Sequence, residues 1–263
     1  MRARSTLKII AVLGLFALIV CCVNVTPSEN KVKVDTSPSE WKPIILKAVV
    51  SGHPDWKPIM WKEGNNIVGI GPEVTRMVFK DINVEVDSRY VGSWDVVQEK
   101  AKTGEIDAIV ALYKTKEREE YLYYSVPYTV DPIVLFFKKG EGFAYSQKEN
   151  LIGKKGVATV GDSYGQELDD FIIQANLNMV RVYTPEQAFA LLREGKADYF
   201  IYSLYAGRKV LNETGASGFE ESGVISNQLF YIGVSKKSPY ANYMKEINAS
   251  LEKLIANNKI PKN

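Results

Sequence analysis

GSWDVVQEKAKTGEIDAIVALYKTKEREEYLYYSVPY, residues 92–128, is the most informative part of this sequence. Ser93 can cap a helix over residues 94–103, because apolar side chains recur there at helical spacing. Gly104 is suited to end this helix, since the residue after a helix commonly needs a left-handed backbone that glycine adopts cheaply. Residues 106–112 then form a nearly continuous apolar run, which is typical of a parallel strand buried on both faces.

An arginine follows this strand on a short predicted helix. Thr115 is placed to cap that helix, and Arg118 lies in its first turn. The N-terminus of a helix carries partial positive charge, and ligands often bind where parallel strands end. A guanidinium group can also hold a carboxylate through two parallel hydrogen bonds. We therefore expect Arg118 to bind an anion; the alternative is a surface arginine paired with Glu117 or Glu120.

Four ordered motifs in this region resemble those of a known family. The family pattern is an aromatic residue and Asp opening a helix, followed by Gly-x-Ile-Asp-Ala, Thr-x-x-Arg and Ser-x-Pro-Tyr. The chain carries these motifs as Trp94-Asp95, Gly104-Glu105-Ile106-Asp107-Ala108, Thr115-Lys116-Glu117-Arg118 and Ser125-Val126-Pro127-Tyr128. The sequence therefore resembles the family 3 periplasmic solute-binding proteins of bacteria, which bind amino acids and similar small polar molecules for ABC importers.

This resemblance implies an α/β fold of the type II periplasmic-binding-protein class, with two lobes. Each lobe would be a mostly parallel sheet flanked by helices, and the ligand cleft would lie between the lobes. The alternation of predicted strands and helices also favours mostly parallel sheets. The resemblance further implies a monomer that needs no cofactor and is not an enzyme. Such a protein delivers its ligand to the membrane permease of an ABC importer.

An internal similarity supports two lobes that are built alike. Gly104-Glu105-Ile106-Asp107 and Gly195-Lys196-Ala197-Asp198 each end a predicted helix and begin an apolar strand. Coincidence is the alternative, because Gly-x-x-Asp is a common way to leave a helix. The expected organisation is a signal peptide over residues 1–22, a polar tether over 23–44, lobe 1 over 45–132, lobe 2 over 133–229 and a return to lobe 1 over 230–263.

The N-terminus has the composition of an export signal. Three basic residues among the first eight precede an apolar run over residues 9–20, which is short for a membrane span. We expect a cleaved signal peptide and a periplasmic protein; an uncleaved membrane anchor is the alternative. A lipid anchor at Cys21 or Cys22 is also open, although the residue before either lacks the usual small side chain. Without the three basic residues the chain is close to neutral, which argues against nucleic acid as a partner.

By the resemblance, five residues of lobe 1 contact the ligand, namely Trp56, Trp94, Ala111, Tyr113 and Arg118. The two tryptophans would hold the ligand between their indole faces, which bury apolar groups and attract cations. Packing in the core is the alternative role for either tryptophan. Tyr113 stands where the family has Ser or Thr, so we expect a smaller or differently shaped pocket. Arg118 would bind the α-carboxylate of the ligand.

In lobe 2 the resemblance assigns Asp162, Ser163 and Ser203 to the ligand site. Residues 161–163 are expected at the start of a helix, where amide groups and the Ser163 hydroxyl would donate to the carboxylate. Asp162 departs from the family pattern, because an acid repels a bound carboxylate; an ordinary helix cap is its alternative role. Ser203 stands where the family has the acid that binds the ligand's amino group.

Because position 203 holds a serine and not an acid, we expect a different kind of ligand. Burying an ammonium group without a carboxylate partner costs several kcal/mol. We therefore expect a small carboxylate ligand whose amino group, if present, is not held as in ordinary amino-acid binders. Asp162, Asp55 or the two indole faces could otherwise hold a positive charge.

Other classes of site receive little support from the sequence. His53 is the only histidine and is expected to be an exposed loop residue, so a zinc site is not predicted. The sequence has no Gly-x-Ser-x-Gly motif, phosphate-binding loop or metal-binding cluster. Two alternative functions are a lyase acting on a small carboxylate, as in a few proteins that resemble this family, and a sensor that presents its ligand to a membrane receptor.

Overall fold

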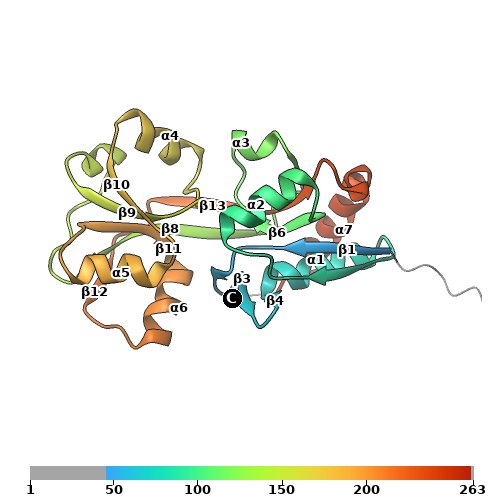
Figure 1. Cartoon of the computed structure of the whole chain (residues 1–263), viewed down its shortest axis with the longest axis horizontal. Helices are drawn as coiled ribbons and strands as arrows, with labels where there is room; N and C mark the ends of the chain where they lie inside the picture. The colour runs from blue at the N-terminus through green and yellow to red at the C-terminus, as the bar shows by residue number, and fades with distance from the viewer. Residues whose placement is uncertain (1–45, 262–263) are drawn as a thin grey trace, which may run out of the picture. The chain divides into compact units, whose positions relative to one another are not determined.

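The computed structural model of the chain describes residues 46–261 (Figure 1). The expected signal peptide over residues 1–22, the tether over 23–44 and the two possible lipidation sites, Cys21 and Cys22, lie outside the described residues. Within residues 46–261, no helix is both long enough and apolar enough to span a membrane. The described residues form an α/β structure with two lobes, as the sequence predicts.

Lobe 1 is built on three parallel strands. Strand β1 (Leu46–Ser51) pairs with β5 (Val84–Ser88) on one side and with β6 (Ala108–Leu112) on the other. All five residues of β6 are buried, as expected for a strand that is covered on both faces. The other elements of this lobe around the sheet are α1 (Ile70–Lys80), α2 (Trp94–Thr103), α3 (Lys116–Glu119), β7 (Leu122–Tyr124), the 3-10 helix η2 (Pro239–Tyr243) and α7 (Met244–Ala256).

A second, smaller sheet in lobe 1 was not predicted from the sequence. It consists of β2 (Asp55–Trp56), β3 (Met60–Glu63) and β4 (Asn66–Val68), which pair antiparallel between β1 and α1 in the chain. These strands are two to four residues long, so no alternating pattern of apolar residues marks them. The small sheet matters because it fixes the position of Trp56.

Lobe 2 repeats the parallel arrangement. Strand β9 (Lys155–Thr159) pairs in parallel with β10 (Asn178–Val182) and with β11 (Tyr199–Ser203). Every residue of β11 is buried. The other elements of this lobe are the 3-10 helix η1 (Lys148–Leu151), α4 (Gln166–Gln174), α5 (Pro185–Arg193), α6 (Leu204–Thr214) and β12 (Phe219–Glu221).

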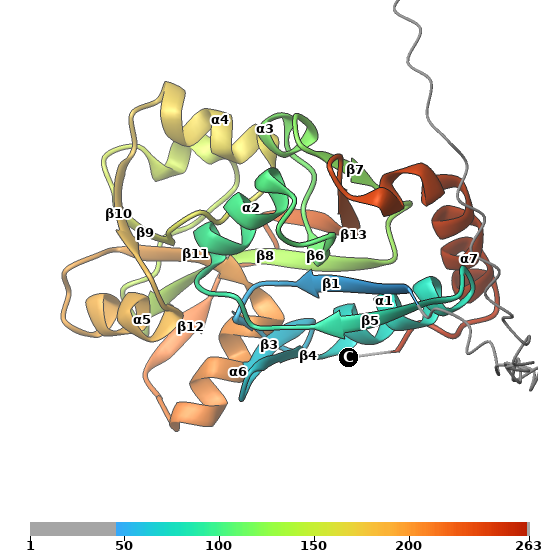
Figure 2. The same ribbon diagram turned by 45° about the vertical axis from the view of Figure 1, so that its right-hand side comes forward.

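Two long antiparallel strands connect the lobes. β8 (Thr129–Lys138) and β13 (Ser226–Ser235) pair with each other, and both run between the two lobes (Figure 2). Because β8 also pairs with β11 and β13 also pairs with β6, the sheets merge in the order β10-β9-β11-β8-β13-β6-β1-β5. The division of the chain into lobes at residues 133 and 230 stays a prediction.

The two similar tetrapeptides of the sequence have the same structural role. Asp107 forms two hydrogen bonds with Val49, from its amide to the Val49 carbonyl (2.7 Å) and from the Val49 amide to its carboxylate (2.8 Å). Asp198 forms the same pair of bonds with Lys155, at 2.7 and 2.6 Å. In each lobe the acid therefore ties its own strand to the neighbouring parallel strand, which favours repetition over coincidence.

The predicted helix ends are mostly confirmed. Gly104 follows α2 in the left-handed region at φ 85°, and the Thr115 side chain accepts a hydrogen bond from the Arg118 amide at 3.2 Å. Residues 161–163 lead into helix α4, as predicted, and this helix begins at Gln166 with Gly165 as its N-cap. These residues form a turn between β9 and α4, and Asp162 is therefore not the cap of this helix.

Candidate ligand-binding cleft

The candidate site lies where parallel strands of both lobes end. β6 of lobe 1 leads into Tyr113, and β9 of lobe 2 leads into the turn at residues 161–163. Between them is a cavity of about 20 Å³, which has room for about one water molecule. Seven of the eight predicted ligand residues line this cavity, namely Trp56, Trp94, Ala111, Tyr113, Arg118, Asp162 and Ser163.

Arg118 is buried at the junction of the lobes, with 4% of its surface exposed. It donates from Nε to the Gln98 side chain (3.0 Å), from Nη1 to the Tyr113 carbonyl (3.0 Å) and from Nη2 to the Gly161 carbonyl of lobe 2 (3.1 Å). Its guanidinium carbon also lies 5.4 Å from the centre of the Trp94 ring. The alternative of an exposed arginine paired with an acid on its own helix is therefore wrong.

These partners leave part of the Arg118 guanidinium group for a ligand. All three acceptors are neutral, so the positive charge of Arg118 is hydrogen-bonded but not neutralised by them. A guanidinium group has five N–H bonds, and these interactions use three. One N–H on each terminal nitrogen is left to donate to a ligand carboxylate.

Asp162 is paired with His53 across the cleft. The His53 Nε2 atom lies 3.3 Å from the Asp162 carboxylate, and both side chains are buried. The second carboxylate oxygen of Asp162 accepts a hydrogen bond from the Thr159 hydroxyl. The expectation that His53 is an exposed loop residue is therefore wrong: only 5% of its surface is exposed, because it meets an acid of the other lobe.

The hydrogen bonds of His53 define which of its nitrogens carries a proton. The Asp55 amide donates to Nδ1 at 2.9 Å, so Nδ1 is an acceptor. Nε2 then carries the proton and faces the Asp162 carboxylate at 3.3 Å. The imidazole ring also contacts both tryptophans, with centroid distances of 5.3 Å to Trp56 and 5.4 Å to Trp94.

Ser163 is held by an acid of its own lobe. Its hydroxyl donates to the Asp169 carboxylate, which also accepts from the Tyr164 amide at 2.9 Å. Burial raises the pKa of Asp169, while the hydrogen bonds from Ser163 and Tyr164 oppose this shift. Because its proton is directed to Asp169, the Ser163 hydroxyl in this arrangement does not donate to a group in the cavity.

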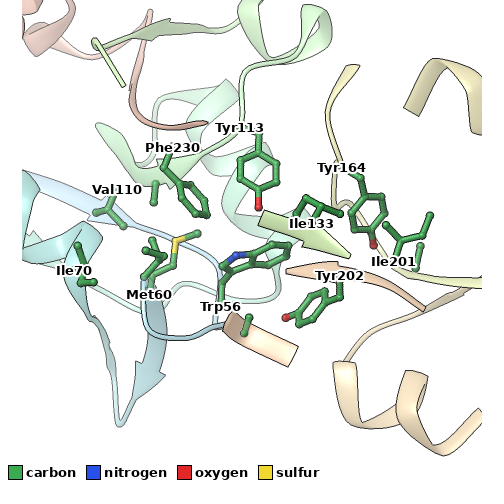
Figure 3. Close-up of a cluster of buried hydrophobic side chains, with 14 of the residues drawn as sticks. Trp56, Met60, Ile70, Val110, Tyr113, Ile133, Tyr164, Ile201, Tyr202 and Phe230 are labelled. Atoms are coloured by element: carbon green, nitrogen blue, oxygen red, sulfur yellow. The ribbon is translucent and has the colours of Figure 1, made fainter. Parts of the chain in front are cut away.

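Several aromatic rings gather beside the cavity, among them Trp56, Tyr113, Tyr202 and Phe230 (Figure 3). The Tyr113 ring lies 5.9 Å from Trp56 and 4.8 Å from Phe230, measured between centroids. On the lobe 2 side, Tyr202 lies 4.7 Å from Trp56 and donates its hydroxyl to the Asp55 carbonyl at 2.7 Å. The cleft is therefore small because Tyr113 and its aromatic neighbours occupy it, in agreement with the expectation from the large residue at position 113.

Asp131 on β8 is a buried acid at this site that the sequence analysis missed. Its carboxylate accepts hydrogen bonds from Trp56 Nε1 (2.7 Å), the Tyr113 hydroxyl (2.5 Å) and the Ser203 hydroxyl (2.6 Å). Burial raises the pKa of Asp131, and the three hydrogen bonds oppose this shift. Burial and the nearby Asp131 charge also raise the pKa of Tyr113, so its hydroxyl keeps its proton and remains a donor.

Ser203, the eighth predicted residue, lies outside the cavity lining. It is 1% exposed, donates to Asp131 and accepts a hydrogen bond from the Ala206 amide at 3.2 Å. One signal in the sequence could have identified Asp131. It is an acid two residues before the apolar run of residues 133–137, where a charge needs a special reason if it is buried.

A larger polar cavity lies on the outer side of Arg118. It measures about 310 Å³ and is lined by Gln98 and Glu117 of lobe 1 together with Asp169 and Arg181 of lobe 2. Arg118 and the turn at residues 161–163 line both cavities. They therefore form the boundary between the inner, aromatic cavity and this polar groove.

Residues 48–262 match the family described as bacterial extracellular solute-binding proteins, family 3. Among curated proteins, none matches the sequence significantly.

Solved structures of several proteins share the fold. A histidine kinase sensor domain with similarity to periplasmic binding proteins has a TM-score of 0.71 at 19% identity, over 81% of this chain and 92% of that chain. A mutant of ArgBP from T. maritima has a TM-score of 0.67 at 24% identity, over 81% and 91%. The L-arginine-bound substrate-binding protein AbpA of an amino acid ABC transporter from Streptococcus pneumoniae has 0.67 at 20%, over 81% and 91%.

Proposed function

The chain belongs to family 3 of the bacterial extracellular solute-binding proteins, and we propose that it captures a small carboxylate or amino-acid-like ligand between its two lobes. It then delivers this ligand to the membrane permease of an ABC importer. The protein works as a monomer that is exported by the signal peptide over residues 1–22 and acts in the periplasm, free or lipid-anchored at Cys21 or Cys22.

The observation that carries this proposal is the position of Arg118. It is a buried cation on lobe 1 that donates to lobe 2 and still has two N–H bonds suited to a carboxylate. A carboxylate at this position contacts Arg118 and the turn at residues 161–163 together. Because such a ligand interacts with both lobes, its binding favours the closed arrangement.

The same geometry favours binding over catalysis. His53 is the one neutral base in the cleft, and its acceptor nitrogen already receives the Asp55 amide. Its other nitrogen carries the proton and faces Asp162 at 3.3 Å, so this arrangement leaves no free nitrogen to accept a proton from a substrate.

A calorimetric titration with the common L-amino acids and their deaminated analogues tests the proposal. We expect at least one member to bind with one-to-one stoichiometry and to reduce the radius of gyration in X-ray scattering. Ligand should also change the intrinsic fluorescence, because Trp56 and Trp94 line the cavity. If no carboxylate in the panel binds, or if saturating ligand leaves the radius and the fluorescence unchanged, the proposal fails.

Similarity to a histidine kinase sensor domain supports a second candidate function, in which the protein presents its ligand to a membrane receptor. Both candidates use the same cleft and differ in the membrane partner. Uptake of labelled ligand by cells with and without the gene separates them. Loss of uptake on deletion supports the importer, whereas unchanged uptake together with a lost transcriptional response supports the sensor.

A further inference from the structure

Asp131 is a carboxylate whose partners include no positive charge. It is 2% exposed, and its three hydrogen-bond donors are an indole, a phenol and an alcohol. Among the ion pairs of the described residues 46–261, none involves Asp131. An acid buried in this way usually has a cationic partner, since neutral donors compensate only part of the lost hydration.

The carboxylate lies beside the position where the sequence lacks an acid. Ser203 ends β11, and its hydroxyl is 2.6 Å from Asp131. Asp131 comes from β8, the strand that pairs with β11, with Ser203 opposite Ile133 in the register. A negative charge is therefore present next to Ser203, although it is supplied by a different strand.

The surroundings of Asp131 suit an organic cation. The Trp56 ring has both the Tyr113 and the Tyr202 ring as neighbours, and Trp56 and Tyr113 donate directly to the carboxylate. Aromatic faces attract a cation that has lost its water, and a buried carboxylate adds a charge-assisted hydrogen bond. His53 and Arg118 are the basic groups that line the adjoining cavity, and their described contacts go to residues other than Asp131.

Tyr113 occupies the space in front of this carboxylate. Its hydroxyl donates to Asp131, and its ring lies between Trp56 and Phe230. With the ring in this place, about 20 Å³ is free, which is too little for an amino acid. The hydroxyl thus stands where an ammonium group of a ligand would donate, and the ring stands where the rest of that ligand would lie.

We infer that Asp131 binds the ammonium group of an amino-acid ligand and that the Tyr113 hydroxyl takes the place of this group until the ligand displaces it. The inference rests on the proposed function and specifies its ligand as a zwitterion, with the carboxylate on Arg118 and the ammonium on Asp131. The exchange replaces a hydrogen bond from a neutral donor by one between two opposite charges.

The test compares the Tyr113→Ser variant with the wild-type protein by calorimetry against the common L-amino acids. Because serine removes the ring, we expect the best ligand to bind Tyr113→Ser at least tenfold more tightly. We also expect this variant to bind the amino acid at least a hundredfold more tightly than its deaminated analogue. Equal affinity of Tyr113→Ser for the two analogues overturns the inference, and so does failure of this variant to bind any amino acid.

A second substitution in the Tyr113→Ser background identifies the acid. Asp131→Asn should reduce the preference for the amino acid over its deaminated analogue to less than about fivefold. Asp87→Asn is the control, since Asp87 lies on β5, pairs with Lys47 and Arg89 and is outside the cavity lining, and it should keep the preference. Circular dichroism and thermal melting identify a variant that fails to fold, and the analogue comparison on Tyr113→Ser alone then decides the inference.

The outcomes separate this inference from the proposed function. Binding of both analogues with similar affinity, lost on Arg118→Ala, leaves a carboxylate-binding protein and removes the role of Asp131. If the preference for the amino acid survives Asp131→Asn, Asp131 is likewise not the group that binds the ammonium. Absence of binding in the wild type and in every variant removes both.

Discussion

Asp107 in lobe 1 and Asp198 in lobe 2 bind the neighbouring strand in the same way, yet the segments that follow them differ. After Asp107, β6 leads through Tyr113 into a separate short helix that carries Arg118. After Asp198, β11 leads directly into α6, with Ser203 as the residue that caps it. The two lobes therefore share the framework and differ in the loop beyond the strand.

This difference shows how recognition is divided. The longer connection of lobe 1 provides the cation, Arg118, and the ring that fills the cleft, Tyr113. The short connection of lobe 2 provides a hydroxyl, and the acid beside it comes from the connecting strand β8. A repeated scaffold thus has an asymmetric site, in which the anion-binding group lies in one lobe and the acid lies between the lobes.

The largest expected effect comes from the arginine of lobe 1. Arg118→Ala should weaken ligand binding by about 2–5 kcal/mol, because a buried carboxylate loses its charged partner. Arg208→Ala is the control in lobe 2, since its side chain is exposed and paired with Glu221. Calorimetry should find that the control binds the ligand with an affinity within about twofold of wild type. If the ligand affinity of Arg118→Ala also stays within a few-fold of the wild-type affinity, the carboxylate does not bind at Arg118.

The two equivalent acids should differ in their effect on stability. Asp107→Ala should lower the free energy of unfolding by about 1–3 kcal/mol, because Val49 is half-buried and Asp107 also accepts from the Ser238 hydroxyl. Asp198→Ala should cost about 0.5–1.5 kcal/mol, since Lys155 is exposed. Urea unfolding measures both values, and an equal or reversed order would contradict this comparison.

Stability should also depend on pH through the acid between the lobes. Burial raises the pKa of Asp131 above its value in the unfolded chain, so this acid is harder to ionise in the folded protein. Its contribution to stability is therefore present at low pH and is lost as the pH rises through the folded pKa. We expect the stability difference between wild type and Asp131→Asn to shrink from about pH 4 to about pH 7. A stability difference that grows over this pH range argues against a raised pKa of Asp131.

The smallest expected effect belongs to an exposed contact between the lobes. Lys57 of lobe 1 lies 2.6 Å from Glu213 of lobe 2, and both side chains are partly exposed. Exposed ion pairs contribute little, so Lys57→Ala should change ligand affinity by less than about 1 kcal/mol. The same titration in low and high salt checks this value. If Lys57→Ala lost as much ligand affinity as Arg118→Ala, the main contribution to ligand binding would lie at the rim of the cleft.

Much of the fold could be predicted because its signals are local. Gly104 and Thr115 mark helix boundaries through their own backbone and side-chain chemistry, and the apolar run of β6 marks a buried strand. The sheet of β2, β3 and β4 left no such signal, since its short strands depend on pairing with one another. Residues 161–163 were predicted to lead into a helix, as they do, but the contact of this turn with Asp169 inside that helix was not predicted.

The site was only partly predictable because its contacts join distant residues. Asp131 accepts hydrogen bonds from Trp56, Tyr113 and Ser203, which are 75, 18 and 72 positions away in the sequence. His53 was expected to be exposed because nothing near it in the sequence indicates that Asp162 of the other lobe covers it. Motif spacing thus indicated which residues gather at the cleft, whereas their pairing required the folded chain.

Native mass spectrometry of the exported protein, with a mixture of amino acids and their deaminated analogues, tests the central claim most directly. The account predicts one small carboxylate ligand bound to each wild-type chain and none bound to the folded Arg118→Ala variant. A wild-type chain that remains free of every carboxylate in the mixture, or an Arg118→Ala chain that retains the same ligand, would contradict it.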